Sequence, residues 1–407
     1  MKPRIPVPAG SDFPVENLPY GVFDPGDGPR LGVALGDHVV DLRAAATAGL
    51  LPHGTALSAA VLNPFLALGP AAWAETRVAI TAMLTSDRFD RLPAATIRSR
   101  DAVRMHRPFD PGDYVDFYSS IQHAINLGRL FRPGTEPLNP NWRHLPVAYH
   151  GRSSSIVVSG TPVRRPRGQV KPGDDPPHTA PTLALDFELE VGFITGPGNA
   201  LGESISADRA ADHIFGLVLV NDWSARDIQR WEYVPLGPFL GKSFATSVSP
   251  WVVTLEAVAP FMVPGPAQDP EPVEYLRTAG DWGLDLELEV ALRPEGAADD
   301  QVVTRTNFAA TYWTMAQQLA HVTVNGTNVR PGDLYASGTI SGPDPGSYGS
   351  LIELTMNGRN PLPMIDGSER SFLRDGDTVI LRGWCERPGL PRIGFGDCTG
   401  TIVPALP

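Results

Sequence analysis

The sequence predicts a mainly β protein of the α+β class, in which a small N-terminal β unit precedes a larger strand-rich part. First, 41 glycines and 42 prolines make up about one fifth of the 407 residues, against roughly 12% on average, as in chains with many tight turns. Second, 42% of the residues are apolar, which is enough to fill a core and disfavours disorder. Third, short apolar runs bounded by turn residues recur along the chain, whereas amphipathic helical segments are few.

The N-terminal β unit is expected to span residues 1–107. Residues 31–42 contain two short apolar runs around a Gly-Asp pair and predict two strands. Residues 56–68 and 71–84 predict two modest helices. A charged, proline-containing stretch follows, and the C-terminal part is therefore expected to span residues 108–407.

Strands dominate the C-terminal part, and helices are expected at residues 119–128, from Ser224 to Tyr233, and at 307–321. Serine residues precede the first of these helices, as is usual at a helix N-terminus. The predicted strands are residues 155–159, 183–194, 216–222, 252–255, 284–292, 351–356 and 378–384.

Two acids interrupt the apolar run 183–194. Glu188 and Glu190 lie two residues apart, so on a strand their carboxylates point to the same face. Two buried anions repel each other unless a positive group lies between them. A hard divalent cation such as Mg²⁺ or Ca²⁺ is the natural partner, because these ions take oxygen ligands. The simpler alternative is a solvated strand face that carries two spare acids.

Four further acids differ in their context. Asp222 ends an apolar strand just before a helix, and Asp116 precedes the helix that carries His123. Either aspartate is a candidate ligand, although an aspartate before a helix is more often a cap. Glu287 and Glu289 repeat the two-residue spacing in a clearly alternating run. No motif surrounds that pair, so we expect both to lie on a solvated face.

Side chains on two predicted helices suit catalysis. Arg226, Gln229, Arg230 and Tyr233 share one helix face, and these groups suit an oxyanion or a carboxylate substrate. An ordinary polar helix surface is the alternative. His123 lies off the apolar stripe of its helix and is the preferred candidate among nine histidines for a general base.

Composition excludes several classes of protein. The net charge is −12, and no basic segment interleaved with aromatic residues follows a phosphate backbone, so a nucleic-acid partner is not expected. The two cysteines, Cys385 and Cys398, are too few for a disulfide framework or a structural zinc site, and free buried thiols are expected. The N-terminus lacks an apolar run of signal-peptide length, and the chain has no stretch of about 18 apolar residues that would span a membrane. A cytoplasmic protein is the expectation.

Six motifs resemble the fumarylacetoacetase family. They cover residues 11–23, 113–120, 140–146, 149–152, 221–229 and 392–396. The resemblance runs from about residue 11 to the C-terminus. It implies an N-terminal SH3-like small barrel followed by a C-terminal β-roll catalytic domain. It also implies a homodimeric hydrolase that splits fumarylacetoacetate, a dicarboxylate diketone, into fumarate and acetoacetate in the last step of tyrosine and phenylalanine breakdown.

The resemblance also implies a role for each matching residue. The metal ligands would be Asp116, Glu188, Glu190 and Asp222, with Lys242 and Thr246 beside the ion. His123 would be the general base, oriented by Glu353. The developing oxyanion would be held by Arg226, Gln229 and Lys242. The substrate would further contact Tyr118, Arg132, Tyr149, Tyr233 and Thr339. Two positions depart from the family pattern: Ile121 stands where the family has arginine, and Ala148 where it has glycine.

Other functions fit the same residues. One alternative is an acylpyruvate hydrolase, isomerase or decarboxylase of the same superfamily, which would act on a different carbonyl substrate. A second is a non-catalytic, metal-stabilised β protein. A paired-carboxylate glycosidase is disfavoured, because acids two residues apart on one strand are too close to flank a sugar.

Overall fold

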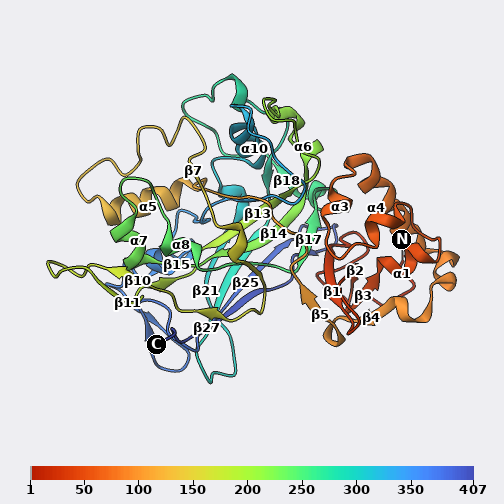
Figure 1. The fold of residues 1–407 in the computed structure, drawn as a ribbon, viewed down its shortest axis with the longest axis horizontal. Helices are drawn as coiled ribbons and strands as arrows, with labels where there is room; N and C mark the ends of the chain where they lie inside the picture. The colour runs from red at the N-terminus through yellow and green to blue at the C-terminus, as the bar shows by residue number, and fades with distance from the viewer. Residues whose placement is uncertain (1) are drawn as a thin grey trace.

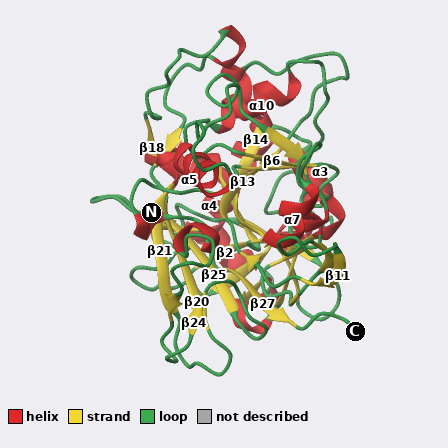
Figure 2. Ribbon diagram, turned by 90° about the vertical axis from the view of Figure 1, so that its left-hand side faces the viewer, coloured by secondary structure: helices red, strands yellow, loops and turns green. Residues whose placement is uncertain are grey.

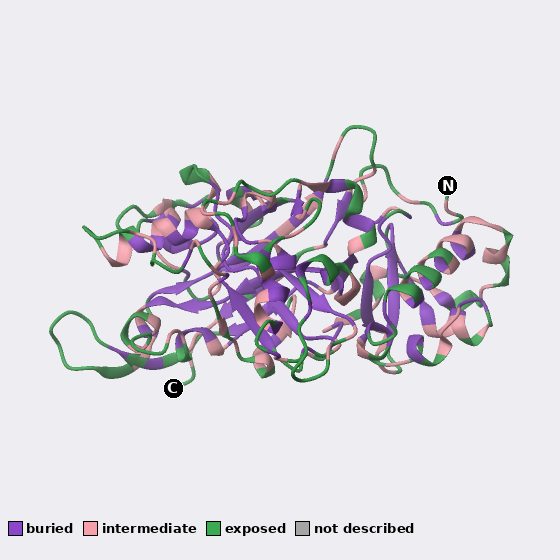
Figure 3. Ribbon diagram, turned by 90° about the horizontal axis from the view of Figure 1, so that it is seen from above, coloured by how far each residue is buried: buried purple, intermediate pink, exposed green. Residues whose placement is uncertain are grey.

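The computed structural model describes residues 2–407 and shows a mixed α/β protein built mostly from strands (Figures 1 and 2). The N-terminal unit lies at one end of the long axis, and the strands of the C-terminal part fill the rest (Figure 1). Buried residues follow the central strands, while exposed residues gather in the loops (Figure 3). None of the helices in residues 2–407 combines the length and the apolar character that crossing a membrane would require.

A 13-stranded sheet joins the N-terminal unit to the rest of the chain. The junction is the antiparallel pair of β1 and β17, in which Tyr20 lies opposite Val252. Along the sheet the order is β4 (Ile97–Ser99), β3 (His38–Asp41), β2 (Arg30–Leu35), β1 (Tyr20–Asp24), β17 (Trp251–Thr254), β14 (Ile214–Asp222), β13 (Leu189–Thr195), β22 (Leu334–Ala336), β6 (Tyr114–Phe117) and β7 (Ala148–His150). Three strands pair off this path: β5 (Arg104–His106), β8 (Ile156–Val158) and β16 (Thr246–Val248).

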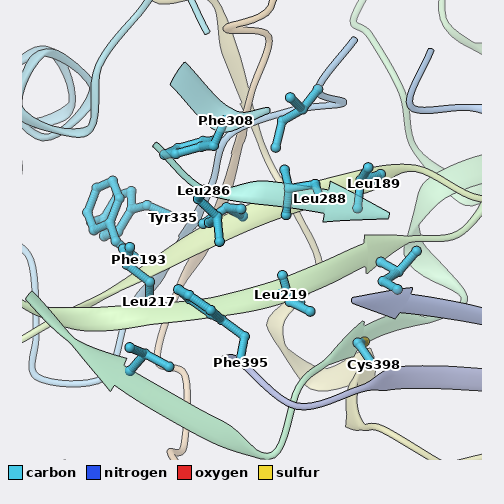
Figure 4. Close-up of a cluster of buried hydrophobic side chains, with 14 of the residues drawn as sticks. Leu189, Phe193, Leu217, Leu219, Leu286, Leu288, Phe308, Tyr335, Phe395 and Cys398 are labelled. Atoms are coloured by element: carbon cyan, nitrogen blue, oxygen red, sulfur yellow. The ribbon is translucent and has the colours of Figure 1, made fainter. Parts of the chain in front are cut away.

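A second sheet has six strands, and a large apolar core lies against both sheets. The strands are β21 (Gln301–Asn307), β20 (Glu287–Arg293), β25 (Thr378–Cys385), β27 (Cys398–Val403) and β9 (Val163–Arg164), with β26 (Ile393–Gly394) paired to β25. Leu189 and Phe193 of β13, Leu217 of β14 and Leu288 of β20 contribute to this core (Figure 4). Phe193 stacks on Tyr335, with ring centroids 5.0 Å apart. Four two-stranded pairs complete the strands: β10 (Arg167–Val170) with β11 (His178–Pro181), β12 (Leu185–Asp186) with β15 (Ser224–Ala225), β18 (Met262–Val263) with β19 (Gly283–Leu284), and β23 (Leu362–Pro363) with β24 (Glu369–Arg370).

The helices are short, apart from α4 and α5. They are α1 (Leu42–Thr47), α2 (Gly54–Leu57), α3 (Asn63–Leu66), α4 (Pro70–Thr85), α5 (Ile121–Phe131), α6 (Ala210–His213), α7 (Arg226–Glu232), α8 (Leu240–Ser243), α9 (Leu255–Val258), α10 (Met315–Thr323) and α11 (Leu351–Leu354). Short 3-10 helices lie at Asp87–Arg91, Ala94–Thr96, Arg100–Ala102, Ser153–Ser155, Ala207–Arg209, Ala259–Phe261, Glu274–Leu276, Phe308–Ala310 and Pro345–Ser347. The helix predicted at 71–84 is confirmed by α4. The single helix predicted at 56–68 is wrong: the chain forms α2 and α3 there, and Pro64 in the first turn of α3 cannot donate the backbone bond a continuous helix needs.

Two strand predictions near the acids are wrong in detail. The run 183–194 is not one strand, because β12 ends at Asp186 and β13 begins at Leu189. Glu188 lies in the break, where its N–H donates to the Asn221 side chain (3.1 Å). Residues 351–356 were expected to form a strand, but the chain forms helix α11 instead. The Asp186 carboxylate accepts hydrogen bonds from the first backbone N–H groups of α11, a local stabilisation that propensity does not encode.

The prediction that Glu287 and Glu289 both lie on a solvated face is correct for only one of them. Glu287 is exposed, but Glu289 is buried, so the expectation of a solvated face is wrong for Glu289. Glu289 is held by Arg305 on β21 (2.8 Å) and Arg382 on β25 (3.1 Å), the strands on either side. Burial of an acid therefore does not by itself indicate a metal site, because cations from neighbouring strands can pair with it. The expectation of free buried thiols is confirmed, since Cys385 is buried and unpaired.

Candidate active site

Four buried carboxylates from the large sheet meet at one place. Asp116 lies on β6, and Asp222 ends β14. Glu188 lies just before β13, and Glu190 is the second residue of β13. One oxygen of each carboxylate lies within 4.8 Å of those of the other three. The antiparallel pairing of β13 with β14, in which Leu189 lies opposite Asn221, brings three of the acids to the same edge.

Two cations contact one side of the cluster. Lys242 Nζ lies 2.5 Å from Glu188 Oε2 and 2.6 Å from Asp222 Oδ2. Arg226 Nη1 lies 2.8 Å from Glu188 Oε1. Burial opposes the ionisation of Glu188, but the charges of Lys242 and Arg226 outweigh it and hold the pKa of Glu188 below its ordinary value.

On the other side of the cluster, Glu190 and Asp116 form no ion pair with any of residues 2–407. Both carboxylate oxygens of Glu190 and Oδ1 of Asp116 are buried and have no hydrogen-bond partner within residues 2–407. Burial raises the pKa of both carboxyl groups well above the ordinary range, and the next cause is the Asp222 charge for Asp116 and the Asp116 charge for Glu190. Unpartnered buried oxygens are costly. A donor set made of carboxylates alone fits a hard metal ion, and the cluster is therefore a candidate metal site.

Hydroxyl groups complete the surroundings of Asp222. Thr246 lies opposite Asp222 in the pairing of β16 with β14, and its hydroxyl donates to Asp222 Oδ1 (3.2 Å). The Tyr149 hydroxyl donates to Asp222 Oδ2 (2.9 Å). Tyr149 was predicted as a substrate contact, and the structure places it at a candidate metal ligand.

A buried histidine–carboxylate pair is the second component. Ser120 caps α5, and His123 Nδ1 lies 2.7 Å from Glu353 Oε2 on α11. Burial disfavours ionised Glu353, but the His123 charge and several hydrogen bonds lower the pKa of Glu353 overall. Because a carboxylate can only accept, Nδ1 carries the proton of this bond, and in the neutral ring Nε2 carries the lone pair. A neutral histidine held in this way can act as a general base.

The Glu353 carboxylate has a full set of donors. Asn126 Nδ2 (2.8 Å), Ser341 Oγ (3.0 Å) and Ser350 Oγ (2.6 Å) all donate to it. Glu353 is therefore fixed in orientation, and it fixes the His123 ring.

The predicted oxyanion and substrate residues fall into two groups. Gln229 accepts a hydrogen bond from Arg226 Nη1 (3.2 Å), and Arg226 Nη2 is buried and unpartnered in the described chain. The Tyr118 ring packs edge to face against the His123 ring, with the ring centroids 5.4 Å apart. The Thr339 hydroxyl is likewise buried and without a partner among residues 2–407.

The side chains of Arg132 and Tyr233 form no hydrogen bond with the other predicted site residues described. Arg132 follows α5 and donates to the backbone of Pro137 (2.7 Å). Tyr233 follows α7 with 40% of its surface exposed, and its hydroxyl contacts none of the other predicted site residues described. Both are more exposed than the buried acids and the histidine of the site.

Three residues that hold the site were not singled out from the sequence. Asn126 lies three residues after His123, so a shared helix face was a usable signal. Asp186 continues the two-residue spacing of Glu188 and Glu190 and was equally readable. Nothing in the sequence pattern marks Ser341, because its loop is placed only by the tertiary fold.

A buried carboxylate cluster, which is a candidate metal site, lies near a fixed histidine–glutamate pair on a strand-rich α/β scaffold, an arrangement typical of acid–base enzymes. Residues 16–108 match the family described as fumarylacetoacetase N-terminal, and residues 114–403 match fumarylacetoacetate (FAA) hydrolase C-terminal. The chain belongs to the fumarylacetoacetase family.

Individual relatives agree with this assignment. The fumarylacetoacetase of Homo sapiens is 52% identical, over 99% of both chains. That of Caenorhabditis elegans is 52% identical, over 100% of both, and that of Arabidopsis thaliana is 51% identical, over 100% of this chain and 99% of the relative. A solved fumarylacetoacetate hydrolase from Exiguobacterium antarcticum has a TM-score of 0.55 at 18% identity, covering 95% of this chain and 99% of that one. At that identity the last likeness shows the fold alone.

Proposed function

We propose that the protein is a metal-dependent hydrolase that cleaves fumarylacetoacetate with water to give fumarate and acetoacetate, the last step of tyrosine and phenylalanine breakdown. The observation that carries this proposal is the Arg226 guanidinium, which touches Glu188 of the carboxylate cluster and leaves Nη2 unpartnered among the residues described. The chain is 52% identical to the human fumarylacetoacetase over 99% of both chains, which supports fumarylacetoacetate as the substrate.

Breaking a carbon–carbon bond in a β-diketone needs an activated nucleophile. His123, with Nδ1 held by Glu353 (2.7 Å), takes a proton from water at Nε2. General-base assistance of this kind contributes about 10²–10⁴ in rate. The burial of both side chains keeps the pair in one geometry.

The attacked carbonyl gathers negative charge, which needs donors. We assign this role to Arg226, Gln229 and Lys242, where each preorganised donor contributes roughly 10²–10³ in rate. Tyr118, Arg132, Tyr149, Tyr233 and Thr339 are proposed to hold the dicarboxylate substrate. Arg132 and Tyr233 are partly exposed, which suits contact with a substrate that enters from solvent.

Asp116, Glu188, Glu190 and Asp222 would hold the ion, which we propose is Mg²⁺ or Ca²⁺. Such an ion supplies Lewis-acid polarisation of the diketone oxygens and stabilises the charge on the departing fragment. Lys242 and Thr246 stand beside it, and Lys242 reduces the excess negative charge of four carboxylates.

We further propose that residues 1–107 form an SH3-like barrel domain, that residues 108–407 form a β-roll catalytic domain, and that the protein is a cytoplasmic homodimer. Exposed apolar side chains around the link between α7 and α8 support a second copy as partner. Leu236 is 96% exposed and Phe239 is 63% exposed. Large apolar groups gathered on a surface favour association.

A direct assay tests the proposed reaction. The diketone absorbance of fumarylacetoacetate is followed with the purified protein, with and without a chelator, beside oxaloacetate and acylpyruvates. We expect loss of the fumarylacetoacetate signal that stops with chelator and returns with Mg²⁺ or Ca²⁺. Faster turnover of an acylpyruvate or oxaloacetate would overturn the assignment of fumarylacetoacetate as the substrate. Undiminished activity after chelation would overturn the proposed metal requirement.

A further inference from the structure

Asp186 is a buried carboxylate that contacts two separate parts of the site. It is fully buried at the end of β12. Its Oδ2 lies 2.7 Å from Arg226 Nε. Its Oδ1 accepts from Leu351 N (2.7 Å) and its Oδ2 from Ile352 N (3.2 Å), in the first turn of α11.

The first contact sets the plane of the Arg226 guanidinium. Arg226 Nε donates to Asp186, and Arg226 Nη1 pairs with Glu188 (2.8 Å). Arg226 Nη2 has no partner among the described residues. A planar guanidinium held at two points cannot rotate. Without Asp186, Nε would be a buried donor without an acceptor, and the group would be free to tilt.

The second contact sets the position of Glu353. Helix α11 has only four residues and begins without a side-chain cap from its own N-cap residue, Ser350. Asp186 supplies acceptors for its first N–H groups from a distant strand. Because Glu353 lies in that same turn, a shift of α11 moves the carboxylate that orients His123.

We propose that Asp186 is a positioning residue that fixes the spacing between the oxyanion donor Arg226 and the base pair His123–Glu353. This inference rests on the proposed hydrolase function. Attack by water requires the base and the oxyanion donor to act on one carbonyl in the same step. Asp186 is the one side chain among residues 2–407 that is bonded both to Arg226 and to α11, and so it holds the two groups in register. A misplacement of about 1 Å can cost about 10²-fold in rate.

The test is Asp186→Asn, which keeps the shape of the side chain and still offers one oxygen to α11, but removes the charged acceptor of Arg226. We expect kcat for fumarylacetoacetate to fall about 10²-fold. We expect KM, and the affinity for Mg²⁺ measured by calorimetry, to change less than about threefold, because Asp186 is not one of the four clustered acids that would hold the ion. A kcat within about threefold of the unaltered protein would overturn the inference.

A double-mutant cycle separates positioning from mere stabilisation. In an Arg226→Lys background, Asp186→Asn is expected to lower kcat by less than about threefold, because its partner is already gone. If the fold-losses in kcat of the two single variants multiply in the double variant, Asp186 does not act by positioning Arg226. If Asp186→Asn does not fold, Asp186→Glu keeps the charge but displaces it by one methylene group. The expectation is then a kcat at least about tenfold below that of the unaltered protein, and an unchanged kcat would overturn the inference.

Asp377 offers a matched control. It is a buried aspartate that accepts from Arg370 Nε (2.7 Å) and from the backbone N–H of Arg374 (2.8 Å), and it contacts none of the site residues described. Asp377→Asn is expected to lower the melting temperature and to leave kcat within about twofold. The unaltered protein, in the same assay, separates the two claims: no cleavage there would refute the proposed function, whereas cleavage with an unaffected Asp186→Asn would refute only the positioning role.

Discussion

His123 Nδ1 and Glu353 Oε2 lie 2.7 Å apart, although 230 positions separate the two residues in the chain. The pair forms because α5 and α11 pack together, and both side chains are buried. A contact between residues so distant in sequence is fixed by the whole fold, and the chemistry of the site depends on it.

Replacing His123 with alanine removes the proposed base. We expect kcat to fall by about 10²–10⁴, while Mg²⁺ still binds, because His123 is not among the four clustered acids. Steady-state kinetics and calorimetry measure the two quantities. His321→Ala is the control, since His321 bonds Tyr275 (2.9 Å) and is expected to leave kcat unchanged. Near-normal turnover by His123→Ala would remove the base assignment.

Replacing Glu190 with glutamine removes the acid that has no donor on either oxygen among the residues described. We expect weaker binding of Mg²⁺ or Ca²⁺ by calorimetry and a smaller rise in melting temperature on adding the ion, because ion binding stabilises only the folded state. Glu289→Gln is the matched control, as Glu289 is a buried acid already paired with Arg305 and Arg382. Equal ion affinity in the Glu190 variant and the unaltered protein would count against the metal site.

The stability of the ion-free protein should depend on pH. Burial and the charges of Asp116 and Asp222 raise the pKa of Glu190, whereas an unfolded glutamate has a pKa of about 4.3. The folded state therefore binds a proton that the unfolded state releases, and its stability falls as pH rises above that value. An ion replaces the proton, so we expect a larger gain in melting temperature from Mg²⁺ at pH 7.5 than at pH 5. Calorimetric scans at both pH values decide; an equal gain at each would be inconsistent with proton–metal competition.

Phe193 tests the core that supports the site. It is 1% exposed and stacks on Tyr335. Phe193→Ala should lower the free energy of unfolding by about 3–5 kcal/mol, because it removes apolar contacts and leaves a cavity. Val302→Ala on β21, where the side chain is 42% exposed, should cost far less. Denaturant unfolding measures both variants, and similar losses would contradict the assigned core.

The acids of the candidate metal site could be found from the sequence because local pattern marks them. Glu188 and Glu190 interrupt an apolar run, and Asp222 ends one. The predicted single strand was wrong, since the chain breaks at Phe187, yet the two glutamates still reach one cluster. The burial of the segment was predictable, whereas its backbone path depends on the bond from the Glu188 N–H to the Asn221 side chain, 33 positions away, which local pattern does not contain.

Glu353 and Ser341, unlike His123 and Arg226, could not be derived from local pattern. Glu353 lies in a segment with the composition of a strand that folds as helix α11, because Asp186 satisfies the first N–H groups of that helix. Its role came only from the family resemblance. Ser341 has no sequence signal at all. The solvation predicted for Glu289 failed for the same kind of reason, since its cations arrive from other strands.

The central claim is that a divalent cation neutralises the four buried carboxylates. Crystals soaked in Mn²⁺, an ion that the same oxygen ligands accept, measure this directly by anomalous diffraction. The account predicts one strong peak within roughly 2.0–2.6 Å of oxygens from Asp116, Glu188, Glu190 and Asp222. A cluster without a peak, in which Lys242 alone fills the space between the carboxylates, would contradict it.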